Sequence, residues 1–143
     1  MKSHTITRRL EFDAGHRVYQ HESKCNHVHG HRYVVEVECA GDLDKLGRVI
    51  DFSVIKTKFG KWIDDNLDHG MILFKDDPLY HVWHSGEVSH YNQKHYVMDS
   101  NPTAENMAEL LYKKADEILA NDGVKVTAMT LWETPNCRAT YSE

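Results

Sequence analysis

The sequence lacks any long hydrophobic run and contains only three cysteines. No apolar stretch approaches the roughly 20 residues that a helix needs to cross a bilayer. The first residues also lack the apolar centre of a signal peptide. The cysteines are an odd number in a chain without an export signal, so we expect reduced thiols, one of which can act as a reagent. These absences favour a cytoplasmic protein with no membrane partner.

The chain also has no excess of basic residues. Its formal net charge of -5 offers no general attraction to nucleic acid, although it leaves room for a local basic pocket that binds a phosphorylated small molecule. Hydrophobic residues make up 41% and charged residues 27%, as in an average soluble protein. With 143 residues, we expect one domain over 1–143.

Hydrophobic periodicity predicts strands near both ends of the chain and helices between them. Alternating β-favouring residues predict strands over 4–13, 33–38, 95–98, 125–132 and 139–141. Apolar residues at helical spacing predict one helix from near Ser53 to Leu67 and a second that Asn101-Pro102-Thr103 opens. The stretch 75–94 is expected to be a long loop or a small hairpin. This order indicates an α+β fold, in which an antiparallel sheet carries two helices on one face.

Histidine is the residue present in excess, with eleven copies. The run Cys-Asn-His-Val-His-Gly-His, from Cys25 to His31, places four metal-capable side chains within seven residues. In an extended backbone His29 and His31 share a face, and an antiparallel pairing of the first two strands can bring His16 beside them. Three imidazoles with one open position suit a catalytic zinc ion. His27 follows the same alternation and can replace one of them.

Two alternatives to this zinc site remain open. A rival set of histidines with irregular spacing follows the first helix, namely His81, His84, His90 and His95. The spacing Cys-x-x-x-His also allows Cys25 to be a zinc thiolate. Otherwise Cys25 is a free thiol near a cation, which lowers its pKa and makes it a base or a nucleophile.

Further polar residues follow the predicted helices and strands. Asp68 beside His69 is either an acid/base pair or a helix-end cap. Glu133, at the end of a strand, can accept two parallel N–H groups from an amino-pyrimidinone ring such as a pterin, unless it is merely solvated. Thr103 and Glu105 start the second helix, where they can bind a ligand or cap the helix.

Six segments occur in one order across nearly the whole chain. They are Phe12-Asp13-Ala14-Gly15-His16-Arg17, Cys25-x-x-x-His29-Gly30-His31, Gly47-x-Val49-x-Asp51-Phe52, Leu67-Asp68-His69, Pro102-Thr103-Ala104-Glu105-Asn106 and Trp132-Glu133-Thr134. In this order they resemble the 6-pyruvoyl tetrahydropterin synthase family, and within it the bacterial branch that makes 6-carboxytetrahydropterin for queuosine biosynthesis.

The resemblance implies the tunnelling fold, in which sheets of several subunits join into a barrel. It implies a homo-oligomer, usually a hexamer, with active sites between neighbouring subunits. It also implies roles for single residues. These are zinc binding by His16, His29 and His31, proton transfer by Cys25, a second acid/base unit of Asp68 and His69, and pterin binding by Glu133 with Thr103.

By this resemblance the protein is a zinc-dependent lyase that converts 7,8-dihydroneopterin triphosphate to 6-carboxy-5,6,7,8-tetrahydropterin, acetaldehyde and triphosphate. The alternatives are a 6-pyruvoyl tetrahydropterin synthase acting on the same substrate, and a non-catalytic zinc- or pterin-binding protein. A cysteine rather than a glutamate at position 25 counts against the variants that make hydroxymethylpterin. His27 and the long stretch 75–94 depart from the family pattern, and His27 is a candidate phosphate contact together with Lys24, Arg17 and Arg32.

Overall fold

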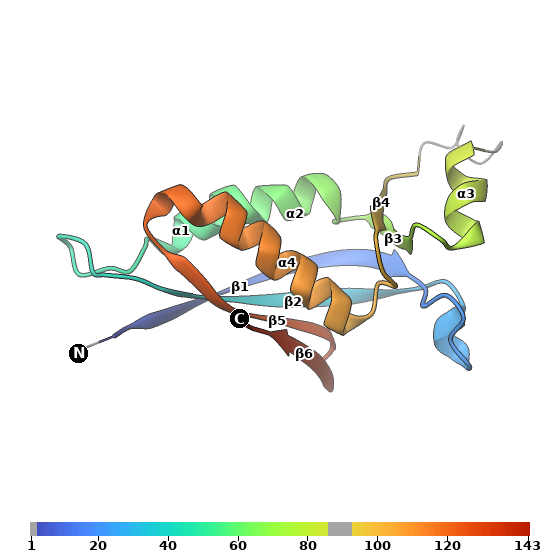
Figure 1. Cartoon of the computed structure of the whole chain (residues 1–143), viewed down its shortest axis with the longest axis horizontal. Coiled ribbons are helices and arrows are strands. Elements are labelled where there is room, and N and C mark those ends of the chain that lie inside the picture. The colour runs from blue at the N-terminus through green and yellow to red at the C-terminus, as the bar shows by residue number, and fades with distance from the viewer. Residues whose placement is uncertain (1–2, 86–92) are drawn as a thin grey trace.

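The computed structural model describes residues 3–85 and 93–143 (Figure 1). Its strands are β1 (Thr5–His16), β2 (His29–Ala40), β3 (Gly70–Phe74), β4 (His95–Met98), β5 (Lys125–Thr134) and β6 (Cys137–Tyr141). Its helices are α1 (Phe52–Ile55), α2 (Lys61–Asn66), α3 (Pro78–Ser85) and α4 (Ala104–Leu119). In these parts of the chain, no helix has the length and apolar character needed to span a membrane.

The strands form one sheet in the order β4-β3-β1-β2-β5-β6. The pairs β1–β2, β2–β5 and β5–β6 are antiparallel, as predicted. The expected antiparallel sheet is wrong at one edge, because β3 runs parallel to the end of β1 and β4 runs parallel to β3. Parallel neighbours need long connections, which the α1–α2 and α3 segments provide here. The predicted α+β class is confirmed.

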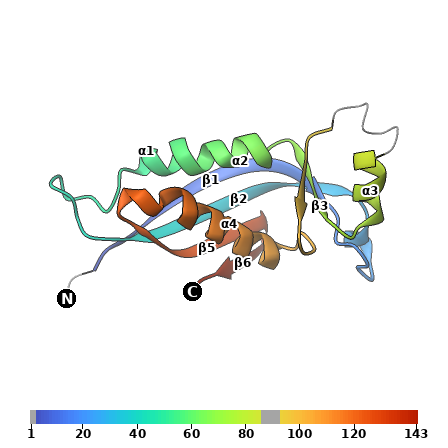
Figure 2. The same ribbon diagram turned by 45° about the horizontal axis from the view of Figure 1, so that its top comes forward.

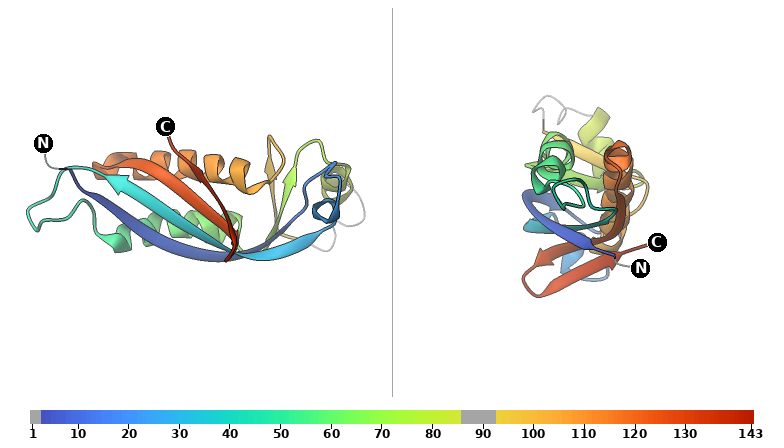
Figure 3. Two further views of the ribbon diagram at one scale, coloured as in Figure 1. Left: turned by 90° about the horizontal axis from the view of Figure 1, so that it is seen from below. Right: turned by 90° about the vertical axis from the view of Figure 1, so that its left-hand side faces the viewer.

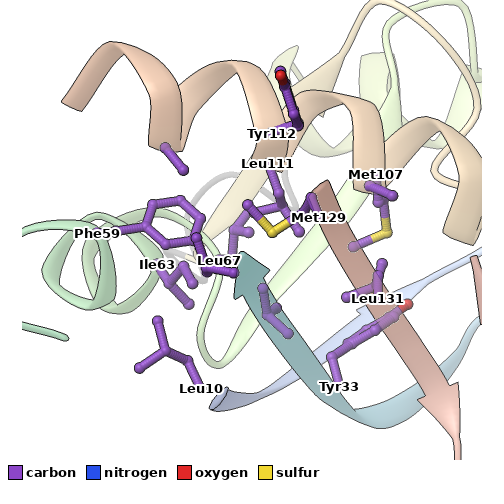
Figure 4. Close-up of a cluster of buried hydrophobic side chains, with 14 of the residues drawn as sticks. Leu10, Tyr33, Phe59, Ile63, Leu67, Met107, Leu111, Tyr112, Met129 and Leu131 are labelled. Atoms are coloured by element: carbon purple, nitrogen blue, oxygen red, sulfur yellow. The ribbon is translucent and has the colours of Figure 1, made fainter. Parts of the chain in front are cut away.

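Helices α1, α2 and α4 cover one face of the curled sheet (Figures 2 and 3). The side chains between these layers form the hydrophobic core (Figure 4). This core includes Phe59 and Ile63 of the helical segment 52–66, Leu111 of α4, and the inward-facing strand residues Tyr33 and Leu131. All five are essentially excluded from solvent. Burying each large apolar side chain contributes about 1.5–3 kcal/mol, so this layer anchors the strands that carry the site.

The first helical segment differs in detail from its prediction. It begins at Phe52 because the Asp51 side chain caps it, accepting a hydrogen bond from the Ser53 N–H at 2.8 Å. A π-helical turn over Lys56–Gly60 links α1 to α2. Asp51, rather than Ser53, is therefore the capping residue.

The prediction of a loop or hairpin over 75–94 is wrong for Pro78–Ser85, which forms α3. Pro78 occupies the first helical turn, where it is well tolerated. Buried Asp77 accepts from the Leu79 N–H at 2.8 Å and also pairs with the Arg17 guanidinium. These contacts stabilise a helix that lacks a strong apolar pattern. Of the predicted stretch, residues 86–92 lie outside the described residues.

Candidate active site

Three histidines meet where β1 ends and β2 begins. The strand register places His16 directly opposite His29, and their Nε2 atoms lie 3.0 Å apart. His31 lies two residues further along β2, on the same face as His29. One ligand atom from each imidazole falls within 4.8 Å of the others. The predicted convergence of these residues is therefore confirmed.

The ring nitrogens are arranged as in a metal site. His16 Nδ1 lies 2.7 Å from the Pro102 carbonyl oxygen, and His29 Nδ1 lies 2.7 Å from that of His27. A carbonyl only accepts, so in the neutral rings each Nδ1 carries the proton and each Nε2 presents a lone pair. Metal-binding histidines commonly have such backbone partners. Two nitrogens about 2.1 Å from a tetrahedral zinc stand about 3.4 Å apart, so the donor set fits zinc.

Burial favours the neutral, metal-binding form of His16 and His31. The side chain of His16 is 1% exposed, and its burial lowers its pKa from 6.5 to about 4, although the Pro102 hydrogen bond opposes the shift. Burial also lowers the pKa of His31, and neighbouring His29 lowers it further. At neutral pH protons therefore compete little with a metal cation for these two rings.

The rival histidines are arranged differently. His81, His84 and His95 pack around Tyr80, with the His84 and His95 ring centroids 6.1 Å apart. His90 lies outside the described residues. Within the parts of the chain that the structure describes, the group of His16, His29 and His31 is the one set of three possible ligands that meets at metal-binding distance.

Cys25 does not belong to this group. It is half-buried in a single 3₁₀ turn, Lys24–Asn26, and the group of three possible ligands contains no sulfur. The Cys25 carbonyl oxygen accepts from the Val18 N–H at 2.8 Å, which ties the turn to the segment after β1. His27 is exposed and also stays outside the group. This geometry favours a free thiol at Cys25 over a zinc thiolate.

Asp68 and His69 form a direct pair, although neighbouring residues rarely bond well. The Asp68 carboxylate lies 2.8 Å from His69 Nδ1 and also accepts from the Asp13 N–H at 2.9 Å. Burial raises the pKa of Asp68, but the bonds from Asp13 and His69, with nearby Lys94, outweigh it and hold the pKa below 3.8. His69 adopts a left-handed backbone with φ of 62°. The carboxylate thus bonds to Asp13 and His69, while the Asp68 backbone N–H closes the end of α2 by donating to the Ile63 carbonyl at 3.0 Å.

A groove and a carboxylate lie beside the Asp68–His69 pair and the three histidines. A groove of about 470 Å³ is lined by residues that include Gly15, His31 and His69. On β5, a Glu133 carboxylate oxygen lies 4.0 Å from His16 Nε2. Burial raises the pKa of Glu133, with His29 lowering it and Glu105 raising it. Glu133 is therefore a half-buried carboxylate beside the histidine centre rather than a solvated one.

Thr103 acts as the N-cap of α4. Its Oγ1 accepts from the Asn106 N–H at 3.1 Å, as a helix cap does, and Glu105 lies in the first turn. Pro102 precedes the cap and supplies the carbonyl that holds His16. The start of α4 thus meets β1 and β5 at the histidine centre.

Sequence reasoning missed two long-range links that hold the segment after β1. The Asn101 side chain accepts from the Tyr19 N–H at 2.8 Å and donates to the Tyr19 carbonyl at 3.0 Å. Arg17, a phosphate candidate, is instead held by buried Asp77, with its Nε 2.8 Å from the carboxylate. Arg32, another candidate, pairs with Asp13 at 2.9 Å. In the sequence, Asn101 is recognisable only as a polar residue before a helix. That pattern indicates a helix cap and not a contact with Tyr19.

A curled α+β sheet with helices on one face is the architecture of the tunnelling fold. The family model described as 6-pyruvoyl tetrahydropterin synthase matches residues 5–143, and the chain belongs to this family. It is 47% identical over 134 residues to the 6-carboxy-5,6,7,8-tetrahydropterin synthase of Rickettsia conorii, covering 92% of this chain and 94% of that protein. It is 30% identical over 158 residues to the Aquifex aeolicus protein of the same name, covering 96% and 97%.

Solved structures share the fold. An uncharacterized protein from Wolinella succinogenes superposes with a TM-score of 0.86 at 26% identity, covering 100% of this chain and 99% of that one. The 6-pyruvoyl tetrahydropterin synthase of Caenorhabditis elegans gives 0.71 at 24% identity, covering 100% and 97%, and supports the fold alone. The chain is thus a member of a pterin lyase family with the tunnelling fold.

Proposed function

We propose that the protein is a zinc-dependent carbon–carbon lyase of queuosine biosynthesis. It converts 7,8-dihydroneopterin triphosphate and water to 6-carboxy-5,6,7,8-tetrahydropterin, acetaldehyde and triphosphate. The observation that carries the proposal is the convergence of His16, His29 and His31, in which the backbone bonds of His16 and His29 leave their Nε2 atoms free to bind a metal. The 47% identity to a protein named for this product supports the choice of reaction.

His16, His29 and His31 would hold the zinc ion. When bound, zinc supplies a Lewis acid that lowers the pKa of a coordinated hydroxyl. The Pro102 and His27 carbonyls fix the tautomers of His16 and His29, so the ligands need little rearrangement.

Proton transfer is assigned to Cys25 and to the Asp68–His69 pair. The Asp68 carboxylate orients His69 through Nδ1, which leaves His69 Nε2 to exchange a proton with the substrate. The His69 side chain is 75% exposed, so a ligand can reach it. Cys25 lies on a turn fixed to the segment after β1, which favours a defined thiol position.

Glu133 is assigned to the pterin ring, because a carboxylate accepts two parallel N–H donors from an amino-pyrimidinone edge. Its partial burial strengthens such bonds by excluding water. Thr103, with neighbouring backbone, and Glu105 would support the ring from the start of α4. His27, which is exposed, would contact the phosphates.

We extend the proposal to a cytoplasmic homohexamer with active sites between subunits and no nucleic-acid partner. β3 pairs with β1 only over Ala14–His16, so in the described part of the chain no strand pairs with this edge of β1 over residues 5–12. The outer edge of β6 is open in the same sense. Open edges favour pairing with another strand, and β1 and β6 of adjacent subunits can satisfy each other. Light scattering on the purified protein tests the hexamer.

The second candidate is a 6-pyruvoyl tetrahydropterin synthase, which the description of the matched family favours. Product analysis after incubation with 7,8-dihydroneopterin triphosphate separates the possibilities. Acetaldehyde release supports the carbon–carbon lyase. A pterin that retains the three-carbon side chain assigns the pyruvoyl enzyme. Binding of zinc and pterin without turnover indicates a non-catalytic protein.

A further inference from the structure

Lys94 contacts the turn that carries Asp68 and His69. Its Nζ donates to the main-chain carbonyl oxygens of Asp64 and Asp68, each at 2.6 Å. Its own carbonyl oxygen accepts from the Met71 N–H at 3.0 Å. Lys94 therefore links the end of α2, the turn and the start of β3.

The peptide group between Asp68 and His69 is fixed at both polar atoms. Its carbonyl oxygen accepts from Lys94, and its N–H donates to the Asp13 carbonyl at 2.7 Å. A left-handed backbone, as at His69, is uncommon for a residue other than glycine and persists only where surrounding contacts impose it. Lys94 and Asp13 supply those contacts from opposite ends of one peptide group.

We propose that Lys94 is a positioning residue for the Asp68–His69 pair, an inference that rests on the function proposed above. Without the ammonium group, the Asp68 carbonyl loses its fixed donor and the peptide group can rotate. His69 can then relax from its left-handed backbone, which moves the imidazole away from the Asp68 carboxylate. Because proton transfer depends on sub-ångström placement, turnover falls while the zinc site on β1 and β2 stays intact.

A simpler role for Lys94 is that of a cation at the end of α2, where it stabilises the last carbonyls of the helix. That role predicts lower thermal stability with normal kcat per folded molecule. The positioning role instead predicts a change in kcat with little change in KM, and recovery by a second side chain that can donate to two carbonyls.

The test compares Lys94→Met, which keeps the aliphatic stem, with Lys94→Arg, which keeps the charge and the donors. Lys75→Met, at an exposed lysine, is the matched control. We expect Lys94→Met to lower kcat by about 10- to 100-fold, with KM and zinc content within about twofold of wild type. Lys94→Arg should recover most of the loss. Native-state hydrogen exchange of the His69 amide should accelerate by about tenfold or more in Lys94→Met alone.

Wild-type kcat in Lys94→Met, or unchanged exchange of the His69 amide, overturns the proposal. If Lys94→Met does not fold, Lys94→Gln takes its place in both measurements. If the wild-type protein fails to turn over dihydroneopterin triphosphate, the proposed function fails, but the exchange measurement still decides whether Lys94 fixes the turn.

Discussion

The Nδ1 atom of His16 lies 2.7 Å from the carbonyl oxygen of Pro102, a residue 86 positions further along the chain. This bond fixes the ring tautomer of His16 and joins the end of β1 to the start of α4. The orientation of a proposed metal ligand therefore depends on the closure of the whole fold, and not only on the β1–β2 hairpin.

Replacing a proposed ligand should remove zinc. We expect His29→Ala to reduce bound zinc from about one ion per chain to a small fraction, because a three-ligand site cannot hold the ion on two imidazoles. His31→Ala provides a second test at another half-buried position. Elemental analysis of purified protein gives the zinc content. His81→Ala is the control, and a loss of zinc in that variant would mean that the wrong histidines were assigned.

Cys25→Ala should separate proton transfer from metal binding. We expect unchanged zinc content and folding but a kcat at least about 100-fold lower, which is typical for the loss of a general acid or base. Cys137→Ala, at an exposed thiol, should behave as wild type. If Cys25→Ala loses zinc, the thiol is a ligand and its proposed role is wrong.

Glu133→Gln should weaken pterin binding. Charge-assisted hydrogen bonds contribute about 1.5–3 kcal/mol, so we expect the dissociation constant for dihydroneopterin, measured by calorimetry, to rise about 10- to 100-fold. Glu117→Gln, at an exposed position on α4, controls for the loss of one charge. An unchanged dissociation constant in Glu133→Gln would remove this residue from the pterin site.

Asp77→Asn should destabilise the fold, because buried Asp77 pairs with the partly exposed Arg17. Removing one partner of a fully buried ion pair costs about 3–5 kcal/mol. The Arg17 side chain is 21% exposed, so we expect a smaller loss, which denaturant unfolding at pH 7 can measure. Burial raises the pKa of Asp77, but bonds from Arg17 and the Leu79 N–H outweigh it and hold the pKa below 3.8.

The pH dependence of that stability follows from the lowered pKa. The contribution of the Asp77 carboxylate is fully present above the unfolded value of 3.8 and is lost as the pH falls through the lower folded value. The stability difference between wild type and Asp77→Asn should therefore shrink below about pH 4. Asp76→Asn, at the exposed neighbouring residue, should leave stability nearly unchanged at every pH.

The local part of the site could be predicted from the sequence. His29 and His31 share one face of β2, and the antiparallel pairing of β1 with β2 returns His16 to them. Strand periodicity and this pairing together bring the three rings together. The run of β-favouring residues also located the hairpin of β5 and β6, although Glu133 proved to lie inside β5.

Contacts between distant segments were not predictable in this way. The bonds of His16 to Pro102, Asn101 to Tyr19 and Arg17 to Asp77 each span at least 60 residues. No local pattern encodes such partners. Helix α3 was missed for the same reason, because a cap and an ion pair stabilise it rather than an apolar periodicity. The parallel edge of β3 and β4 likewise depends on chain connections that strand propensity does not describe.

The most direct test is the zinc dependence of product formation by the wild-type protein. Metal-free and zinc-reconstituted protein are incubated with 7,8-dihydroneopterin triphosphate, and acetaldehyde and 6-carboxytetrahydropterin are quantified together. If the proposed function is correct, the zinc-loaded protein forms equal amounts of the two products and the metal-free protein forms almost none. Full activity without zinc, or a product that keeps its three-carbon side chain, would contradict it.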